Sequence, residues 1–220
     1  MRHLFLLAAL FCACISYAQI RVQERLPKSK TGFALTTAKT RAKIYYDVND
    51  ALVIKRSAEL FARDIQMVTG QKPELIQKRE RAKALVIVGT IEKNQWICEL
   101  AQKGKIDIRP LQGAWERYLI QTVDNPSPGV AKALVIAGSD RRGAAYGLFS
   151  ISEMMGVSPW YWWGDVPVKT HKALYVDAPP TYSKTPSVKY RGIFLNDEDW
   201  GLKPWAAKTF EKERGNIGPR

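Results

Sequence analysis

Three consecutive carboxylates near the carboxyl end of the chain are the residues best suited to chemistry. The preceding segment, 188–195, is rich in apolar residues and is predicted to form a short buried strand. Four polar side chains and an indole follow it directly: Asn196, Asp197, Glu198, Asp199 and Trp200. Polar groups at a strand end cannot all be buried without partners, whereas β/α barrels place such groups at the carboxyl ends of their strands, where active sites lie. We therefore predict that 196–199 form the floor of a site; the alternative is a solvated acidic turn.

Glycoside hydrolysis is the reaction that these carboxylates could support. Glycosidases use a pair of carboxyl groups, one acting as an acid and the other as a base or nucleophile according to its surroundings. Because successive side chains of an extended chain point to opposite sides, Asp197 and Asp199 would share one face and Glu198 the other. At least one carboxylate should then point into the pocket.

Histidine and cysteine are too scarce for the other common catalytic and metal sites. After residue 18 the chain contains one histidine, His171, and one cysteine, Cys98. A serine or cysteine nucleophile activated by histidine, and a zinc site, both need more of these residues at suitable spacings. His171 is expected to be a surface or edge residue of a strand. We predict no metal and no cofactor.

The glycines of 138–147 resemble a phosphate-binding loop in spacing only. The spacing of Gly138 and Gly143 fits, but Ala144 and Ala145 occupy the positions where lysine and a hydroxyl residue are required, and the chain has no G-x-G-x-x-G segment. Small residues on adjacent turns instead allow a helix to lie close to its neighbours. We therefore expect no nucleotide site.

The segment 158–167 is the most aromatic part of the chain. It contains Trp160, Tyr161, Trp162 and Trp163 in succession, flanked by proline and glycine. Such a cluster could stack on sugar rings, with Trp162 and Trp163 as substrate-binding residues, or form a wall between two domains. The sequence leaves both interpretations open.

The elements that must position these residues indicate an α/β domain. Strands are predicted at 33–37 and 43–46, which would open a mixed sheet. A helix follows with apolar residues spaced by three and four from Ile54 to Val68; Asn49 or Asp50 would cap it and Gly70 would end it. Further elements are expected in this order: a buried strand at 84–90, a helix at 93–103, a strand at 115–123, a turn at 124–129, a strand at 131–139, a helix at 140–155 and a strand at 171–176.

Two of these strands nearly repeat each other in sequence. Residues 131–139 match 82–90, and each segment leads through glycine and a hydroxyl residue toward a helix. Two copies are too few for a repeat architecture, so two βα units in one small sheet are predicted.

The first 18 residues have the features of a secretory signal peptide. Arg2 precedes an apolar segment, 4–13, that is too short to span a bilayer, and Ser16 and Ala18 provide the small residues of a cleavage site. We expect an exported protein beginning at Gln19, periplasmic, surface-bound or secreted, without a transmembrane segment. The formal net charge is +13. Because the basic residues are dispersed and the protein is expected to be exported, nucleic acid is not the expected partner, whereas an acidic polysaccharide fits.

Three motifs together resemble glycoside hydrolase family 115. They are 138–147, 160–167 and 190–201, and the similarity continues through 205–210 and 215–219. The resemblance implies the N-terminal part of a xylan α-1,2-glucuronidase, which removes glucuronic or 4-O-methylglucuronic acid from glucuronoxylan with inversion. It also implies that Asn196 and Asp197 contact the uronic sugar. A homodimer of the full-length protein stays open.

The predicted organisation has four parts. A signal peptide (1–18) precedes an N-terminal α/β accessory domain (19–178), a stiff linker (179–187) and the start of a catalytic (β/α)8 barrel (188–220). Such a barrel takes about 250 residues, so the general acid and base are expected beyond residue 220. The chain alone should then be inactive. The alternative is a non-catalytic carbohydrate-binding or accessory α/β protein.

Overall fold

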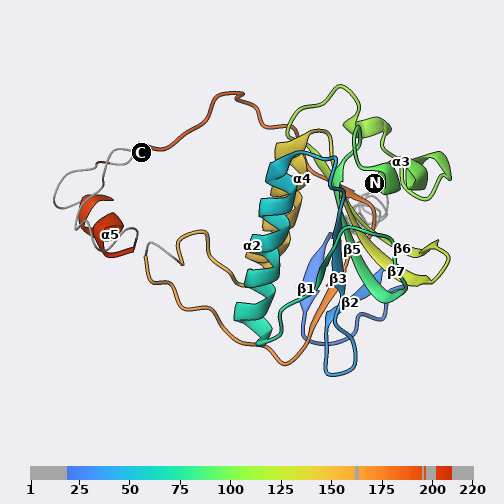
Figure 1. The fold of residues 1–220 in the computed structure, drawn as a ribbon, viewed down its shortest axis with the longest axis horizontal. Coiled ribbons are helices and arrows are strands. Elements are labelled where there is room, and N and C mark those ends of the chain that lie inside the picture. Colours follow the sequence, from blue (N-terminus) through green and yellow to red (C-terminus); the bar gives the residue numbers. More distant parts are fainter. Residues whose placement is uncertain (1–18, 162–163, 195, 197–201, 210–220) are drawn as a thin grey trace, which may run out of the picture. The chain divides into compact units, whose positions relative to one another are not determined.

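The computed structural model describes residues 19–161, 164–194, 196 and 202–209 (Figure 1). Its contacts divide the chain into two units, Met1–Pro186 and Ser187–Arg220. The signal peptide predicted at 1–18 lies outside the described residues. None of the described helices is both long and apolar enough to cross a membrane.

The first unit is built on a six-stranded mixed sheet, as predicted. Its strands in spatial order are β4 (Leu75–Ile76), β3 (Lys43–Tyr46), β5 (Ala82–Thr90), β7 (Val130–Gly138), β6 (Tyr118–Ser127) and β9 (Thr181–Tyr182). The first four are parallel, whereas β6 runs antiparallel to both β7 and β9. The two similar sequence segments become the neighbouring strands β5 and β7, which confirms the prediction of two βα units in one sheet.

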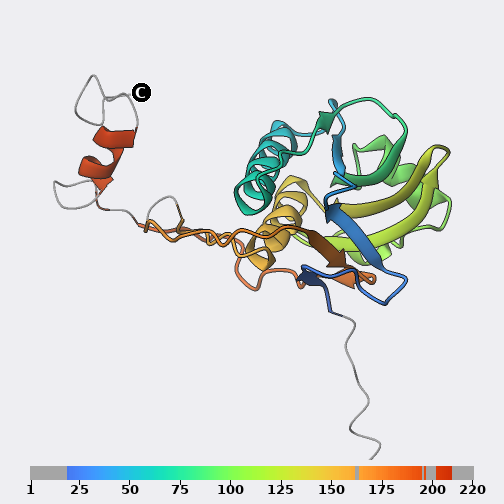
Figure 2. The ribbon, with the colours of Figure 1, turned by 90° about the horizontal axis from the view of Figure 1, so that it is seen from below.

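Helices cover both faces of this sheet (Figures 1 and 2). On one face lie α2 (Leu52–Thr69) and α4 (Arg141–Met154), and on the other lie α3 (Gln95–Gln102) and the short 3-10 helix η2 (Arg109–Leu111). Side chains of β5 alternate between the two layers: Val86 and Val88 pack with the α2 and α4 side, and Leu85 and Ile87 with the α3 side. An unbroken apolar strand sequence is therefore required, because neither face of β5 is open to water.

A second, three-stranded sheet completes the unit. Its order is β1 (Arg21–Gln23), β8 (Leu174–Asp177) and β2 (Gly32–Thr36), all antiparallel. The prediction that 33–37 and 43–46 open one sheet was therefore wrong, although both strands exist. A turn in which Thr37 N–H donates to the Thr40 carbonyl at 2.7 Å redirects the chain between them.

The three predicted helices of this unit form, and most of their ends lie at residues that favour a helix end. Gly70 ends α2 with a φ of 72°, Asp140 caps α4, and Asn94 caps α3. The predicted cap of α2 by Asn49 or Asp50 was wrong, because Ala51 occupies the cap position; Asp50 accepts instead from the Ala51 N–H at 2.8 Å.

The small residues around α4 allow close packing, as predicted. A Cβ atom at Gly138 would lie 2.2 Å from the backbone nitrogen of Ala144, and one at Gly143 would lie 2.3 Å from the Arg117 carbonyl oxygen. A Cβ at Gly147 would meet the Ile136 side chain at 2.6 Å. These glycines bring α4 against β7 and the start of β6.

Two predicted connections contain strand structure. β6 continues through most of the predicted turn 124–129, with a register irregularity between Asp124 and Ser127. The predicted linker 179–187 contributes β9 to the edge of the sheet, where Thr181 pairs with Ile120. In both places a neighbouring strand supplies backbone partners, which overrides the local turn and proline signals.

The second unit contains the helix α5 (Leu202–Thr209), and the described residues of its predicted strand do not form one. Residues 188–194 are neither a strand nor buried; Tyr190 is 86% exposed and Phe194 is 90% exposed. The prediction of a short buried strand over 188–195 was therefore wrong for this chain in its described part. A parallel strand needs neighbours on its edges and a covering layer, and none of the described residues pairs with this segment. A barrel start is accordingly not observed.

Replacing Gly138 by alanine should lower the free energy of unfolding by about 3 kcal/mol, because the new Cβ would overlap backbone atoms that cannot move aside alone. Gly164→Ala is the matched control, since its Cβ would meet its nearest neighbour, the Trp160 carbonyl oxygen, at 3.4 Å. Chemical denaturation of both variants checks this. Equal stabilities would contradict the packing role of Gly138.

Candidate functional site

Most of the predicted acidic floor lies outside the described residues. Asp197, Glu198, Asp199 and Trp200 are not among them, so the arrangement of the carboxylates stays a prediction. Asn196 is described and half-buried, and its carbonyl accepts a hydrogen bond from Leu202 N–H at 2.8 Å. This bond ties Asn196 to the first residue of α5.

The carboxyl ends of the parallel strands, where α/β sheets usually bind ligands, are occupied here by structural hydrogen bonds. Asp50 accepts from the backbone N–H of Thr90 at 2.7 Å and from its hydroxyl at 3.0 Å. Asn94 donates from its amide to the Val88 carbonyl at 3.0 Å and accepts from two backbone N–H groups of α3. These side chains fasten the start of α2 and the start of α3 to the end of β5.

The segment 138–147 has the same structural role at the end of β7. Asp140 accepts from the N–H groups of Arg142 and Gly143, each at 2.9 Å, and its second oxygen accepts from Glu116 N–H at 2.6 Å. Ser139 accepts from Arg117 N–H at 3.0 Å. One carboxylate thus caps α4 and holds the start of β6.

A pocket of about 460 Å³ lies between α2 and α4 and is bounded by the beginning of the aromatic segment. Its aromatic side chains are Tyr146 and Phe149 of α4 and Tyr161 of the segment that follows. Its ionisable side chains include Arg63, Asp64 and Glu153. Aromatic faces beside a few polar groups are the usual composition of a binding pocket for a small organic molecule or sugar.

The aromatic segment forms one wall of this pocket. The Arg63 guanidinium lies 5.6 Å from the centre of the Tyr161 ring, within the range of a cation–π contact. Trp160 is 51% exposed, and its backbone is held by the Ser158 hydroxyl and by Gly164. Trp162 and Trp163, the predicted sugar-stacking residues, lie outside the described residues. Tyr161 thus belongs to a pocket, while the stacking role of the two indoles stays a prediction.

Asp64 is the unusual group in this pocket. It is 4% exposed, and burial raises its pKa above the ordinary 3.8, although the nearby Ser152 hydroxyl and Arg63 guanidinium act in the opposite direction. Asp64 was not among the site residues predicted from the sequence. The available signal was its position in α2, three residues after Phe61 on the apolar face, where a carboxylate is not expected.

A metal centre has no support in the part of the chain that the structure describes. Within it, no three histidine, cysteine or acidic side chains come together in a way that could hold an ion. Cys98 is a free thiol there, and its hydrogen donates toward the Ile91 carbonyl. His171 lies 2.8 Å from a Glu24 carboxylate oxygen, and its backbone N–H donates to the Val68 carbonyl at the end of α2.

Comparison with known proteins connects both units to one family. Residues 183–219 match the sequence model of glycosyl hydrolase family 115. The chain is also similar to the structure of BtGH115A, a family 115 4-O-methyl-α-glucuronidase described as having specificity for decorated arabinogalactans. That match has a TM-score of 0.63 and 34% sequence identity, and it covers 81% of this chain and 22% of the other. The chain thus spans about a fifth of that protein's length.

Other similarities are weaker. CpGH84D matches with 12% identity and a TM-score of 0.43, covering 73% of this chain and 22% of its own. A family 20 β-N-acetylhexosaminidase from Streptomyces coelicolor A3(2) matches with 12% identity and a TM-score of 0.38. That match covers 77% of this chain and 25% of the hexosaminidase. A sequence search of curated proteins gave no match.

Replacing Asp64 by asparagine should stabilise the protein near neutral pH. Because burial raises this pKa, the folded protein holds the proton more tightly than the unfolded chain, and stability is lost as the pH rises through the raised pKa. Asparagine removes that loss, so the advantage of Asp64→Asn should shrink as the pH falls through the raised pKa and should be absent below 3.8, the ordinary value. Urea denaturation across this pH range measures it. A parent protein more stable than the variant near neutrality would contradict the stated cause.

Proposed function

We propose that this chain, which resembles the N-terminal part of family 115 glycoside hydrolases, belongs to an exported enzyme that releases glucuronic or 4-O-methylglucuronic acid from a polysaccharide. The observation that carries the proposal is the 34% identity, over 81% of the chain, to a 4-O-methyl-α-glucuronidase. The match of residues 183–219 to the family supports it independently, because this range includes the predicted acidic site. The proposed mechanism is inverting general acid and base catalysis.

In this proposal the segment 188–199 is the first strand and loop of the catalytic barrel. Its apolar side chains support this, since Ile193 and Phe194 are 73% and 90% exposed in the described chain. Large apolar side chains gathered in one exposed segment usually have a partner surface. The remaining barrel strands would bury them and would carry the general acid and base.

Asn196 and Asp197 are proposed to bind the uronic sugar. An amide offers both donors and an acceptor, and a carboxylate accepts from two hydroxyl groups, so the pair can hold adjacent sugar hydroxyls in one orientation. Glu198, Asp199 and Trp200 are assigned to the same subsite. Trp162 and Trp163 are proposed to stack on sugar rings of the substrate.

The substrate is proposed to be glucuronoxylan or its oligosaccharides. Decorated arabinogalactan is a second candidate, because the similar glucuronidase is described as acting with that specificity. Both polymers carry a uronic acid, so the released sugar would be the same and the neighbouring sugars would differ.

The two substrates are distinguished by measuring the release of uronic acid by the full-length protein. Purified glucuronoxylan and glucuronidated arabinogalactan are compared. We expect the higher kcat/KM on glucuronoxylan and no activity from residues 19–220 alone. No release from either polymer by the full-length protein would remove the hydrolase proposal. Binding of residues 19–220 to glucuronoxylan without hydrolysis by any longer protein would then support the non-catalytic accessory alternative.

Asp197→Ala and Asn196→Ala in the full-length protein should each lower kcat/KM by roughly 10- to 100-fold, as expected when hydrogen bonds to a sugar are lost. Glu92→Ala is the control, because Glu92 is an exposed carboxylate between β5 and α3. Steady-state kinetics on an aldouronic oligosaccharide measures the effect. Unchanged kinetics in both site variants would show that this acidic segment does not bind the sugar.

A further inference from the structure

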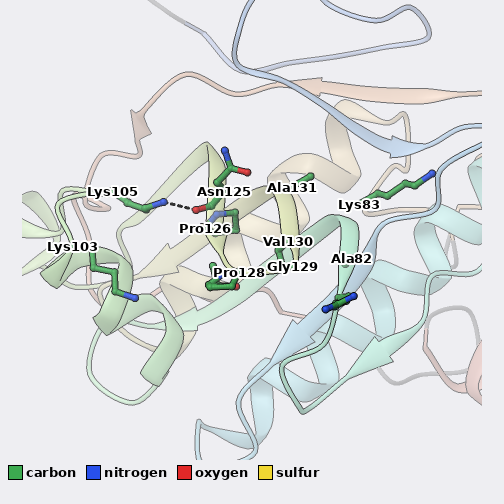
Figure 3. A pocket seen from close by; sticks show the side chains of 12 residues that line it. Ala82, Lys83, Lys103, Lys105, Asn125, Pro126, Pro128, Gly129, Val130 and Ala131 are labelled. Carbon is green, nitrogen blue, oxygen red and sulfur yellow. Dashed lines mark hydrogen bonds between the residues drawn. The ribbon is translucent and has the colours of Figure 1, made fainter.

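The edge of the main sheet at which the parallel strands begin contains a large basic hollow. It has a volume of about 860 Å³ and lies at the starts of β5 and β7 (Figure 3). Residues 81–83 and 125–131 line it, together with Lys103 and Lys105 from the end of α3 and the turn after it. The β6–β7 connection, with Pro126 and Pro128, lies between the lysines of the α3 side and Lys83 of β5 in Figure 3.

The charges of this hollow are all positive. Arg81, Lys83, Lys103 and Lys105 line it, and no acidic side chain does. No ion-pair partner of Arg81 or Lys83 is found among the described residues. Lys103 has only a distant one, Glu99 at 3.9 Å. Lys105 donates to the carbonyl oxygen of Asn125, which leaves its charge uncompensated.

Three acidic residues close in sequence to the lining residues are already paired. Glu80, beside Arg81, lies 2.7 Å from the Lys43 ammonium. Asp124 lies 3.1 Å from the Lys132 ammonium, and Glu99 forms a two-bond pair with the Arg79 guanidinium at 2.8 and 2.6 Å. These pairs satisfy one cation each. The four cations of the hollow are therefore a true surplus of positive charge.

A second hollow, of about 350 Å³, extends the basic character along the same edge. It lies at the start of β3 and is lined by Lys39, Arg41, Lys43, Lys72 and one acid, Glu74. Glu74 is held by Lys43 at 2.9 Å. Because β3 and β5 are neighbours in the sheet, the two hollows begin at adjacent strands. An extended polymer is the kind of ligand that can contact both.

We propose that this basic edge, defined by Arg81, Lys83, Lys103 and Lys105 and extended by the β3 hollow, binds a polysaccharide chain through its carboxylate groups. Such a site would be additional to the hydrolytic one. Several like charges in open hollows raise the local concentration of a polyanion even when each contact is weak. The choice of a uronic acid polymer among polyanions rests on the proposed function.

The composition of the hollows favours a saccharide over nucleic acid. Neither hollow is lined by an aromatic side chain, whereas proteins that bind single strands use aromatic rings on which bases stack. Pro128, which is exposed, offers a small apolar surface against which a sugar face can lie.

The proposal is tested by binding of the 220-residue chain to glucuronoxylan. Affinity electrophoresis and titration at low and high salt measure this binding. The variant Arg81→Gln/Lys83→Gln/Lys103→Gln/Lys105→Gln should weaken binding at low salt by about tenfold and should flatten its salt dependence. Carboxyl-reduced glucuronoxylan should bind weakly to both proteins. Lys83→Glu alone provides a second variant, expected to weaken binding in the same direction.

A control variant removes the same number of positive charges at the opposite edge of the sheet, where α2 and α4 begin and where β5 leads to α3. It is Lys55→Gln/Arg56→Gln/Lys93→Gln/Arg141→Gln. It should bind as the parent does. Equal losses in both quadruple variants, or equal binding of the carboxyl-reduced polymer, would overturn the proposal. So would tighter binding of duplex DNA than of glucuronoxylan at the same salt.

Asn196→Ala/Asp197→Ala separates the two sites: it should abolish hydrolysis by the full-length protein and leave this binding in place.

Discussion

Burial of two neighbouring parallel strands on both faces is the constraint on which the first unit depends. β5 and β7 have apolar side chains on each side, and fully burying such a side chain contributes about 1.5–3 kcal/mol. That gain is realised only if a helical layer covers each face. The pair α2 and α4 therefore has to lie close to one side, which requires glycine at 138, 143 and 147, and α3 has to cover the other.

The same constraint separates the two edges of the sheet chemically. At the carboxyl edge β3, β5 and β7 each lead within a few residues into a helix, and Asp50, Asn94 and Asp140 satisfy backbone groups at these turns. Those side chains are then occupied by structural bonds. At the amino edge the connections 77–81 and 128–129 are exposed, and Arg81 and Lys83 beside them have no ion-pair partner among the described residues. Surplus positive charge gathers at the amino edge for this reason.

Features encoded by short stretches of sequence could be predicted, and features that depend on distant partners could not. The β5 and β7 segments, the end of α2 at Gly70 and the cap at Asp140 follow from apolar patterns and local backbone chemistry. The assignment of β2 to a separate sheet depends on β8, which is far away in sequence. Asp64 was missed because its burial results from packing between two helices. The positions of Asp197 to Trp200 and of Trp162 and Trp163 stay predictions.

The segment 188–194 shows why a strand can be predicted from sequence and still not form among the described residues. Its apolar residues suit a barrel strand, but a parallel strand is stable only between neighbours that satisfy its backbone and cover its side chains. In the described chain Tyr190, Ile193 and Phe194 are exposed, so this segment lacks the covering layer that such a strand needs. Catalysis requires carboxylates held within a fraction of an ångström of their working positions. The residues proposed to bind the sugar would therefore depend on the other strands of the proposed barrel.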